Sequence, residues 1–496
     1  MIALFRKNLP WGTMSLISIG NLLMEINLIA HMGYLPTVLH YLQVSWLDVG
    51  VISSVVYFLH SVSAGFGGLS VPLTTKSLGH KKTFILMLTM SSFSAFFFAF
   101  SRSVWWICIS IVFKGFFAGG VMSVRLISND MCNEDNQYDI LSWTIQVPLA
   151  LAGLIGPSVT SLAVLLPTQY PEKFGSESFL NEFPILVPNL FLGLAAMLIS
   201  LLSCCYLPKD FIALSEQYTE SANETTELLQ AANMTSSPED DATSNEVIDG
   251  DAISLQEDTA RGNTNSGIEQ WSDLSILKKI KTLMCTKDLL LGTILITVHE
   301  ALASGYSAVL PLWLETPINM SGFGMLPKKV GAYFGIVACV SLVSNAFVAP
   351  YLNPKMGAKV SFQVWSLALV VLIALLPVQV LVGVIAVLVI HMALVKCFEG
   401  AAFLSSILFV NNATSRESAQ LAIVFSYTFA KVIVSLANLT FGSIFAWSLT
   451  NNKGMYDKGL GFPFNYSFSF ICIALLHFVC AIVGIFLRND IDARQA

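Results

Sequence analysis

Two ten-residue stretches decide the fold: PLTTKSLGHK at positions 72–81 and PYLNPKMGAK at positions 350–359. In each stretch a Gly follows the first Pro by seven residues, and a Lys follows that Gly by two. Each stretch also joins one long apolar run to the next. A spacing that recurs in the same setting indicates that one half of the chain repeats the other.

Two further spacings recur in the same order along the chain, eleven residues from a Glu to a Pro and fifteen from a Lys to an Asn. They join Glu25 to Pro36, Glu300 to Pro311, Lys114 to Asn129 and Lys396 to Asn411. One such coincidence means little, but three in order predict a duplicated bundle of helices, with the two copies related by a pseudo-symmetry axis.

The composition places these bundles in a membrane. Of the 496 residues 55% are hydrophobic and 12% are charged, and the mean hydropathy is +0.69. Soluble domains carry about 25% charged residues, so a soluble fold is excluded, and the net charge of −6 excludes a nucleic-acid-binding protein. A membrane-spanning helix needs about 20 apolar residues. Twelve such runs are present, at 12–38, 48–71, 83–101, 104–127, 141–166, 184–206, 288–314, 330–350, 360–378, 382–410, 420–447 and 466–487.

The gap after the sixth run divides the chain into three parts. We expect a six-helix bundle over 1–207, a linker over 208–287 and a second six-helix bundle over 288–496. Between Asp210 and Arg261 there are 13 acidic residues and one basic residue, a composition typical of disorder. The linker ends in a basic amphipathic segment, 271–287, which we expect to lie on the membrane surface.

Basic residues set the orientation, because short loops rich in Lys and Arg stay in the cytoplasm. The short loops on one side hold Lys76, Lys81, Lys82, Lys355 and Lys359. Both termini, which lie on that side, are therefore predicted to be cytoplasmic, in an integral multi-pass membrane protein.

Within the linker, Glu224, Leu228 and Leu229 have the spacing of an acidic dileucine sorting signal. Clathrin adaptors read such signals from the cytoplasm. The motif favours an endolysosomal or vacuolar membrane over the plasma membrane, with clathrin adaptors as partners.

Several motifs resemble one known family. Gly153, Gly156 and Pro157 resemble the antiporter motif of the drug/proton antiporter branch of the major facilitator superfamily, and the stretch 72–82 stands in the place of that superfamily's signature loop. The segment 170–184, the His299-Glu300 pair and Lys431 resemble the zinc-induced facilitator-like family. The resemblance covers nearly the whole chain apart from the linker. It implies an all-α membrane protein with twelve transmembrane helices in two pseudo-symmetric six-helix bundles and a binding site between them. It also implies gating loops at Pro72, Gly79, Lys81, Pro350, Gly357 and Lys359.

Ionisable side chains inside the predicted spans are the candidate functional residues, because a charge at the bilayer centre costs about 2.5–3.5 kcal/mol. They are Glu25, His31, His60, Lys114, Arg125, His299, Glu300, Lys396, Glu399 and Lys431. Glu25 and Glu300 occupy repeat-related positions, so we expect them to face each other. Together with His299 they are predicted to take up and release protons. The alternative is that each carboxylate forms a structural pair with a lysine.

The remaining candidates bind substrate or serve as counter-ions. Lys396 and Glu399 are three residues apart and can pair along one helix face. Lys431 has no partner on its own helix and either binds an anionic group or pairs with Glu300. The other candidates of this group are Lys114, Tyr34 and Tyr306. His31 and His60 are expected to be hydrogen-bonded core imidazoles.

No enzyme motif is complete. The zinc-protease pattern that His299-Glu300 would begin has Ala303 where its second His belongs, and no Walker loop is present. We therefore predict a monomeric secondary transporter without metal or cofactor, which moves a small organic solute or metal chelate across the bilayer by proton-coupled antiport. The alternatives are an uncoupled facilitator and a non-transporting membrane sensor or scaffold.

Overall fold

The computed structural model describes residues 9–44, 46–133, 136–164, 172–173, 179–211, 213, 285–318, 321–325, 327–451, 460–489 and 491. Every regular element in these ranges is helical. The sorting signal at Glu224, Leu228 and Leu229 and nearly all of segment 271–287 lie outside the described residues.

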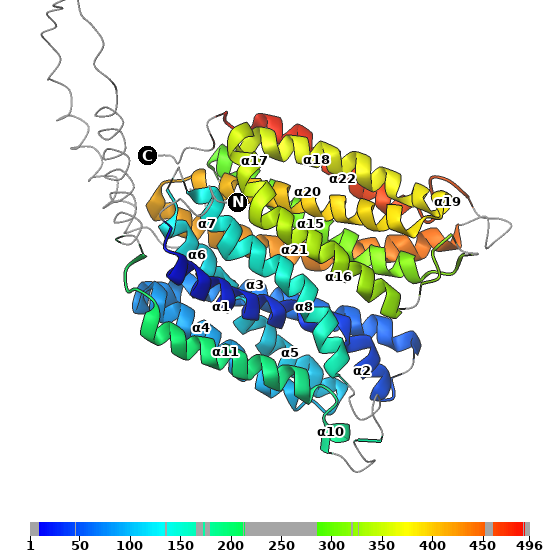
Figure 1. The fold of residues 1–496 in the computed structure, drawn as a ribbon, viewed down its shortest axis with the longest axis horizontal. Helices are drawn as coiled ribbons and strands as arrows, with labels where there is room; N and C mark the ends of the chain where they lie inside the picture. Colours follow the sequence, from blue (N-terminus) through cyan, green and yellow to red (C-terminus); the bar gives the residue numbers. More distant parts are fainter. Residues whose placement is uncertain are drawn as a thin grey trace, which may run out of the picture.

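The first half of the chain forms one bundle, whose helices occupy one side of the molecule in Figure 1. Its elements are α1 (Trp11–Ile29), the 3-10 turn η2 (Ala30–Gly33), α2 (Leu35–Tyr41), α3 (Trp46–Leu78), α4 (His80–Ala99), α5 (Val104–Ala118), α6 (Val121–Met131), α7 (Gln137–Leu141), the π-helical turn η3 (Ser142–Gln146), α8 (Val147–Ala163), α10 (Phe179–Glu182) and α11 (Leu186–Tyr206). Within it α4 packs on α11, α3 on α5 and α1 on α8.

The second half forms the other bundle. Its elements are α15 (Lys287–Glu315), α16 (Pro327–Val343), the π-helical turn η5 (Ser344–Val348), α17 (Ala349–Met356), α18 (Ala358–Leu375), the 3-10 turn η6 (Leu376–Val378), α19 (Gln379–Val382), α20 (Ile385–Asn412), α21 (Arg416–Thr450), α22 (Phe468–Val483) and the 3-10 turn η7 (Gly484–Phe486). Here α15 packs on α21, and α18 packs on both α20 and α22.

Twelve stretches of the described residues are long and apolar enough to cross a membrane. They coincide with the twelve runs read from the sequence, so that prediction is confirmed. Large apolar side chains point outward from both bundles, among them Trp105 and Leu381, each 81% exposed, and Phe191, 76% exposed. Such a surface suits lipid rather than water.

Two spans are broken where the sequence analysis expects continuous helices. The run 12–38 bends through η2 into α2, and the run 104–127 divides at Gly119 and Gly120 into α5 and α6. Gly119 is required there because a Cβ at this position would overlap the carbonyl oxygen of Ala64 on α3. A tight crossing with α3 thus lies at the point where the fourth span breaks.

Two spans contain a π-helical turn, η3 and η5, and each turn ends two residues before a proline, Pro148 or Pro350. Proline has no N–H and its ring clashes with the carbonyl four residues earlier, so a wider turn accommodates it. The two turns meet across the molecule, where the Ser142 hydroxyl donates a hydrogen bond to the carbonyl of Asn345.

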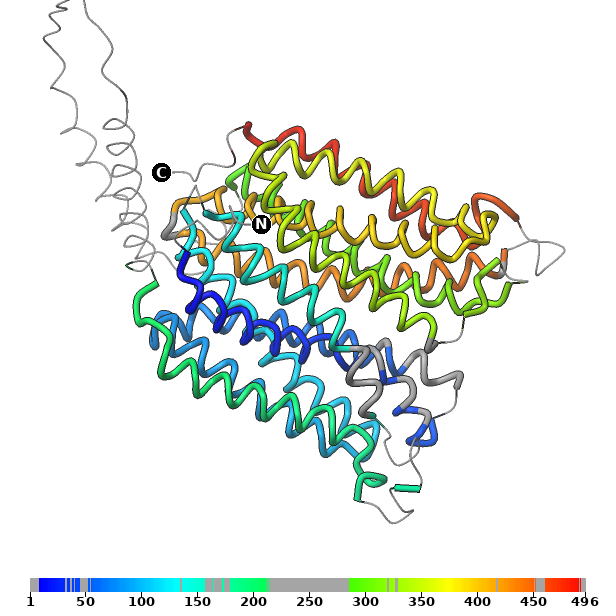
Figure 2. Tube along the Cα trace, viewed as in Figure 1, coloured from blue at the N-terminus to red at the C-terminus, as the bar shows by residue number. Residues whose placement is uncertain are grey.

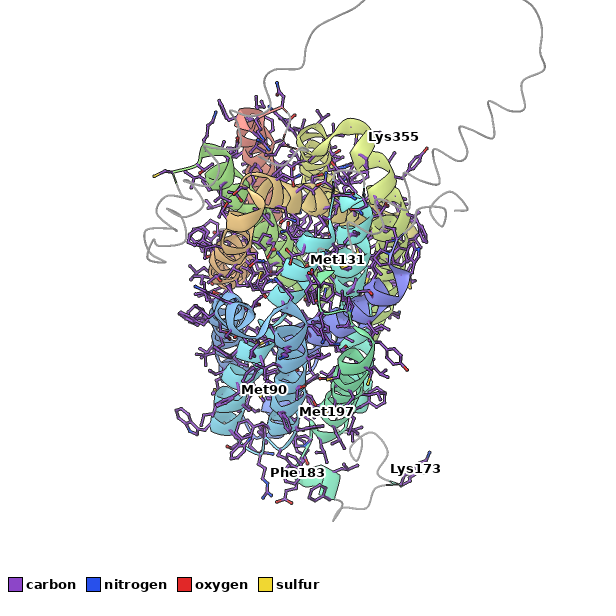
Figure 3. The ribbon with its side chains drawn as sticks, turned by 90° about the vertical axis from the view of Figure 1, so that its left-hand side faces the viewer. Met90, Met131, Lys173, Phe183, Met197 and Lys355 are labelled. Atoms are coloured by element: carbon purple, nitrogen blue, oxygen red, sulfur yellow. The ribbon has the colours of Figure 1, made fainter. Side chains whose placement is uncertain are left out.

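The two bundles contact each other mainly through α3 with α21 and α8 with α16. The start of α1 and the end of α22 lie at one end of the bundles, here called the termini end, whereas α2, α10 and α19 lie at the opposite end (Figures 1 and 2). Figure 3 looks at the termini end, with Met90 and Met197 in the first bundle and Lys355 in the second. Near the termini end the Asn412 amide donates a hydrogen bond to Gln137 Oε1, which links the bundles.

Candidate functional site

The site is a cluster of four charged side chains between the bundles, which we call the central cluster: Glu25, Arg125, Glu300 and Lys431. Arg125 Nη2 lies 3.5 Å from Glu300 Oε1, and Lys431 Nζ lies 3.4 Å from Glu300 Oε2. Arg125 belongs to the first bundle and the other two to the second, so Glu300 is held by one cation from each bundle. The three side chains are only 8%, 10% and 17% exposed in the order Arg125, Glu300, Lys431.

Glu25 on α1 completes the cluster and forms no ion pair within the part of the chain that the structure describes. It is 4% exposed and interacts electrostatically with Lys431, Arg125 and Glu300. Among the described residues no cation lies within 4.0 Å of its carboxylate, whereas Glu300 has two such cations. The repeat-related glutamates therefore lie in one cluster but in different surroundings.

Aromatic rings cover the two cations. The Arg125 guanidinium lies 4.9 Å from the Tyr427 ring centroid and 5.7 Å from that of Phe403. Lys431 Nζ lies 5.0 Å from the Tyr427 centroid, so this ring on α21 contacts both cations. Cation–π contacts of this kind are worth about 2 kcal/mol when desolvated.

A small cavity adjoins Arg125 and Tyr427. Its volume of about 10 Å³ gives room for about one water molecule. Its lining comes from both bundles, with Ile145 from the first and Ile296 and Ser426 from the second. It therefore lies at the interface between the two bundles.

His299 lies next to Glu300 in sequence but its ring turns into the second bundle. His299 Nε2 lies 3.1 Å from the carbonyl oxygen of Glu399, and the ring packs near Phe403 and His477. No hydrogen bond joins it to Glu300 among the described contacts, although the two interact electrostatically.

Lys396 and Glu399 on α20 form the ion pair that their spacing predicts, with Lys396 Nζ 2.9 Å from Glu399 Oε2. Lys396 also donates a hydrogen bond to the Ser307 hydroxyl and lies 5.4 Å from the Tyr306 ring centroid. Tyr306 itself is 1% exposed. These three candidates form a separate group inside the second bundle.

Lys114 and Tyr34 lie together inside the first bundle, joined through Asn189 on α11. Lys114 Nζ donates a hydrogen bond to Asn189 Oδ1 over 3.1 Å, and Asn189 Nδ2 donates to the Tyr34 hydroxyl over 3.2 Å. Lys114 also lies 4.5 Å from the Phe98 ring centroid. It is remote from the ion pairs of the central cluster along its span, because eleven residues of helix separate it from Arg125, about 16 Å.

The repeated stretches form matching turns at the termini end. Gly79 has φ 80° and Gly357 has φ 79°, a region that side chains with a Cβ rarely adopt. Lys81 Nζ donates a hydrogen bond to the carbonyl of Leu207, and Lys359 Nζ donates to that of Leu487, both over 2.6 Å. Each lysine thus ties its turn to the end of the last helix in its own bundle.

The prolines and glycines of the other motifs lie within helices. Pro72 is in α3 and Pro350 is in α17. In α8, a Cβ at Gly156 would lie 3.3 Å from Ile29 Cγ1, which marks the close crossing with α1, and Gly153 has open space around it. Pro157 lies in the same helix.

Arg125 is the residue whose role the sequence analysis misses. It is counted among the charges inside the spans, but its partner Glu300 is 175 residues away and in the other bundle. A local signal is nonetheless present, since Arg125 follows the Gly119-Gly120 break by one turn. Among the described residues, no three or more His, Cys, Asp or Glu side chains gather in a way that could hold a metal ion.

Comparisons with known proteins agree with this architecture. The family profile of the Major Facilitator Superfamily matches residues 17–438, and the chain therefore belongs to this superfamily of transporters. No curated protein matches the sequence.

Solved structures share the fold at low identity. The human organic anion transporter MFSD10 (TETRAN) has a TM-score of 0.62 and 14% identity, with 95% of this chain and 98% of that chain covered. The proton:xylose symporter XylE has a TM-score of 0.65 and 11% identity, with 98% of this chain and 97% of that chain covered. The E. coli fucose:proton symporter FucP has a TM-score of 0.58 and 12% identity, with 97% of this chain and 99% of that chain covered. The all-helical fold with twelve membrane helices in two bundles is thereby established.

Proposed function

We propose that this transporter performs proton-coupled antiport of a small organic solute or metal chelate by alternating access, with the exchange taking place at the central cluster. The observation that carries the proposal is the asymmetry of the two glutamates. Glu300 is held by a cation from each bundle, whereas Glu25 is buried in the same cluster with no cation of the described part of the chain in contact.

The free carboxyl group is the exchanging group. An ionised carboxylate in dry surroundings is costly unless a cation contacts it, so Glu25 carries a proton while the site is empty of substrate. A positively charged group of the substrate then takes the place of that proton at the Glu25 carboxylate. A site that binds either a proton or the substrate, and not both, couples the two flows in opposite directions.

Glu300 provides the connection between binding and movement. The Arg125–Glu300 pair crosses the bundle interface, so rocking of the bundles breaks it, whereas the Lys431–Glu300 pair stays within the second bundle. Protonation of Glu300 weakens both pairs and frees Lys431 and Arg125. The turns at Gly79 and Gly357, with Lys81 and Lys359, act as the gating loops that stiffen each bundle as a rigid body.

The finer assignment follows from the motifs. Gly153, Gly156 and Pro157 support membership of the drug/proton antiporter branch, and His299, Glu300 and Lys431 support kinship with the zinc-induced facilitator-like family. The loop lysines support cytoplasmic termini, with 1–207 and 288–496 as the transport bundles. The sorting signal in the linker supports an endolysosomal or vacuolar membrane and clathrin adaptors as partners.

The test is gradient-driven uptake into proteoliposomes, with a labelled solute taken from a thermal-shift screen of metabolites, chelators and drugs. We expect a pH gradient, acid inside, to drive accumulation of at least tenfold in the unchanged protein and in Glu25→Asp. Glu25→Gln should abolish accumulation, because the amide binds no proton. The matched control Glu399→Gln should retain it, because Glu399 pairs with Lys396 away from the interface.

Two results identify the alternatives. Equal uptake with and without the gradient would make the protein an uncoupled facilitator. Movement of no solute in either direction, combined with loss of a cellular effect when the linker is deleted, would make it a sensor or scaffold.

A further inference from the structure

The first bundle contains a second group of titratable side chains, which we call the imidazole–lysine cluster: His31, His60 and Lys114. His31 and Lys114 are 0% exposed and His60 is 1% exposed. The two imidazole rings meet edge to face with centroids 4.4 Å apart. Lys114 interacts electrostatically with both rings.

The imidazoles have unused hydrogen-bonding capacity. Neither Nδ1 nor Nε2 of His31 has a hydrogen-bond partner in the described part of the chain, and His60 Nε2 has none there either. The expectation that these are satisfied core imidazoles is therefore wrong for His31. Buried polar atoms are nearly always paired, so unpaired ring nitrogens at this depth call for an explanation.

Lys114 differs from the cations of the central cluster in its partners. It donates to the neutral Asn189 amide and lies over the Phe98 ring, and no described carboxylate is within 4.0 Å of its Nζ. A permanently charged ammonium that is fully buried without a counter-ion is costly. A basic nitrogen that binds a proton only part of the time avoids this cost.

The cluster lies between the central cluster and the end of the molecule at which α2 and α10 lie. His31 is six residues beyond Glu25 along α1 and η2, about 9 Å. On the other side, His60 interacts electrostatically with Lys431. The other titratable groups that face the cluster are Tyr57, whose ring centroid is 5.7 Å from that of His31, and Tyr34, reached through Asn189.

We propose that His31, His60 and Lys114 together bind one shared proton and pass it to the carboxylates of the central cluster. The proposal rests on the proposed proton coupling and adds a second proton-binding site to it. In the transfer, an N–H bond of the protonated cluster breaks and leaves its electron pair on nitrogen. Water carries the proton over the distance of about 9 Å along α1 and η2 between His31 and Glu25. An O–H bond then forms on the ionised carboxylate of Glu25.

The number and the kind of ligand follow from the packing. Two positive charges on rings 4.4 Å apart repel strongly in dry surroundings, so the two rings hold one proton between them and not two. A charge on Lys114, which interacts electrostatically with both rings, opposes a proton on either ring in the same way. Because the three side chains are fully buried, their ligand must be one that needs no cavity. A proton is such a ligand.

The experiment counts protons bound by the full-length purified protein between pH 4 and pH 9 in weakly buffered detergent solution. We expect the triple variant His31→Gln/His60→Gln/Lys114→Met to bind one proton fewer than the unchanged protein over this range. A difference of zero would mean a permanently charged lysine beside neutral rings, and a difference of two would mean independent histidines. Either result overturns the shared site. His391→Gln, whose ring nitrogens are both hydrogen-bonded, is the matched control for losing one membrane histidine.

A second measurement does not depend on folding of the triple variant. In histidine-labelled full-length protein, ring-nitrogen NMR signals assigned with His31→Gln and His60→Gln should change together, and their summed protonation should not exceed one. Two rings that never titrate, or titrate separately to a sum of two, overturn the proposal. These counts do not involve transport. Uptake that ignores a pH gradient would therefore contradict the proposed coupling alone, and a count of zero or two would contradict the second site alone.

Discussion

The two bundles agree in their repeated turns and differ in their repeated charges. Gly79 and Gly357 share a positive φ of about 80°, and the lysines that follow them bond to equivalent carbonyls. At the repeated charged positions, Glu300 has two cations in contact, whereas no cation of the described residues lies within 4.0 Å of Glu25. Lys396 likewise pairs with a carboxylate, whereas Lys114 bonds to an amide. The two bundles thus share the geometry of their turns and differ in the surroundings of their charged side chains.

The largest expected effect separates the two glutamates. Glu300→Gln leaves Arg125 and Lys431 buried without a counter-ion, which should lower the free energy of unfolding by about 3–5 kcal/mol. Glu25→Gln removes no ion pair that the described residues make and should lower it by less than about 1 kcal/mol. Denaturant unfolding of the purified protein measures both. Equal losses would remove the asymmetry on which the proposed roles depend.

The next effect concerns the turns and should be the same in both bundles. Gly79→Ala and Gly357→Ala each place a Cβ on a backbone with positive φ and extended ψ, which only glycine adopts readily, at a cost of about 1–3 kcal/mol. The matched control is Gly331→Ala on α16, where a Cβ meets nothing within 4 Å and the backbone is helical. That control should stabilise the protein by about 0.5–1 kcal/mol. A loss in only one bundle would show that the turns are not equivalent.

The smallest effect concerns the lysines that follow the turns. Lys81→Met and Lys359→Met each remove a hydrogen bond from an ammonium group to a helix-end carbonyl. Each change should lower the free energy of unfolding by about 1 kcal/mol, because water screens these partly exposed groups. Lys359 also donates a hydrogen bond to Asn489 Oδ1, so Lys359→Met should lower the free energy of unfolding slightly more than Lys81→Met does. Lys76→Met, an exposed lysine on the same segment, is the control that should leave thermal unfolding unchanged.

The sequence predicts most of the fold because its signals are local. The twelve spans follow from apolar runs, and the matching turns follow from the Pro, Gly and Lys spacing. The breaks at Gly119 and the π-helical turns before Pro148 and Pro350 are not predicted, because they depend on contacts with α3 and on how a helix accommodates a proline.

The sequence predicts which residues belong to the site better than it predicts which of them contact each other. Glu300 and Lys431 are identified and do pair, but the sequence cannot place Arg125 against Glu300, since the pairing depends on how the two bundles dock. The direction of the His299 ring is similarly set by its neighbours Phe403 and His477. Repeat spacing places Glu25 and Glu300 together, and only the packing distinguishes them.

The sign of a pH change tests the central claim most directly. Proteoliposomes containing the protein and a trapped pH-sensitive dye are given the screened solute on the outside, with no gradient imposed. Antiport at Glu25 predicts that the lumen becomes more alkaline as each entering solute expels a proton, and that Glu25→Gln gives no change. A lumen that becomes more acidic, or stays constant while the solute enters the unchanged protein, would contradict the account.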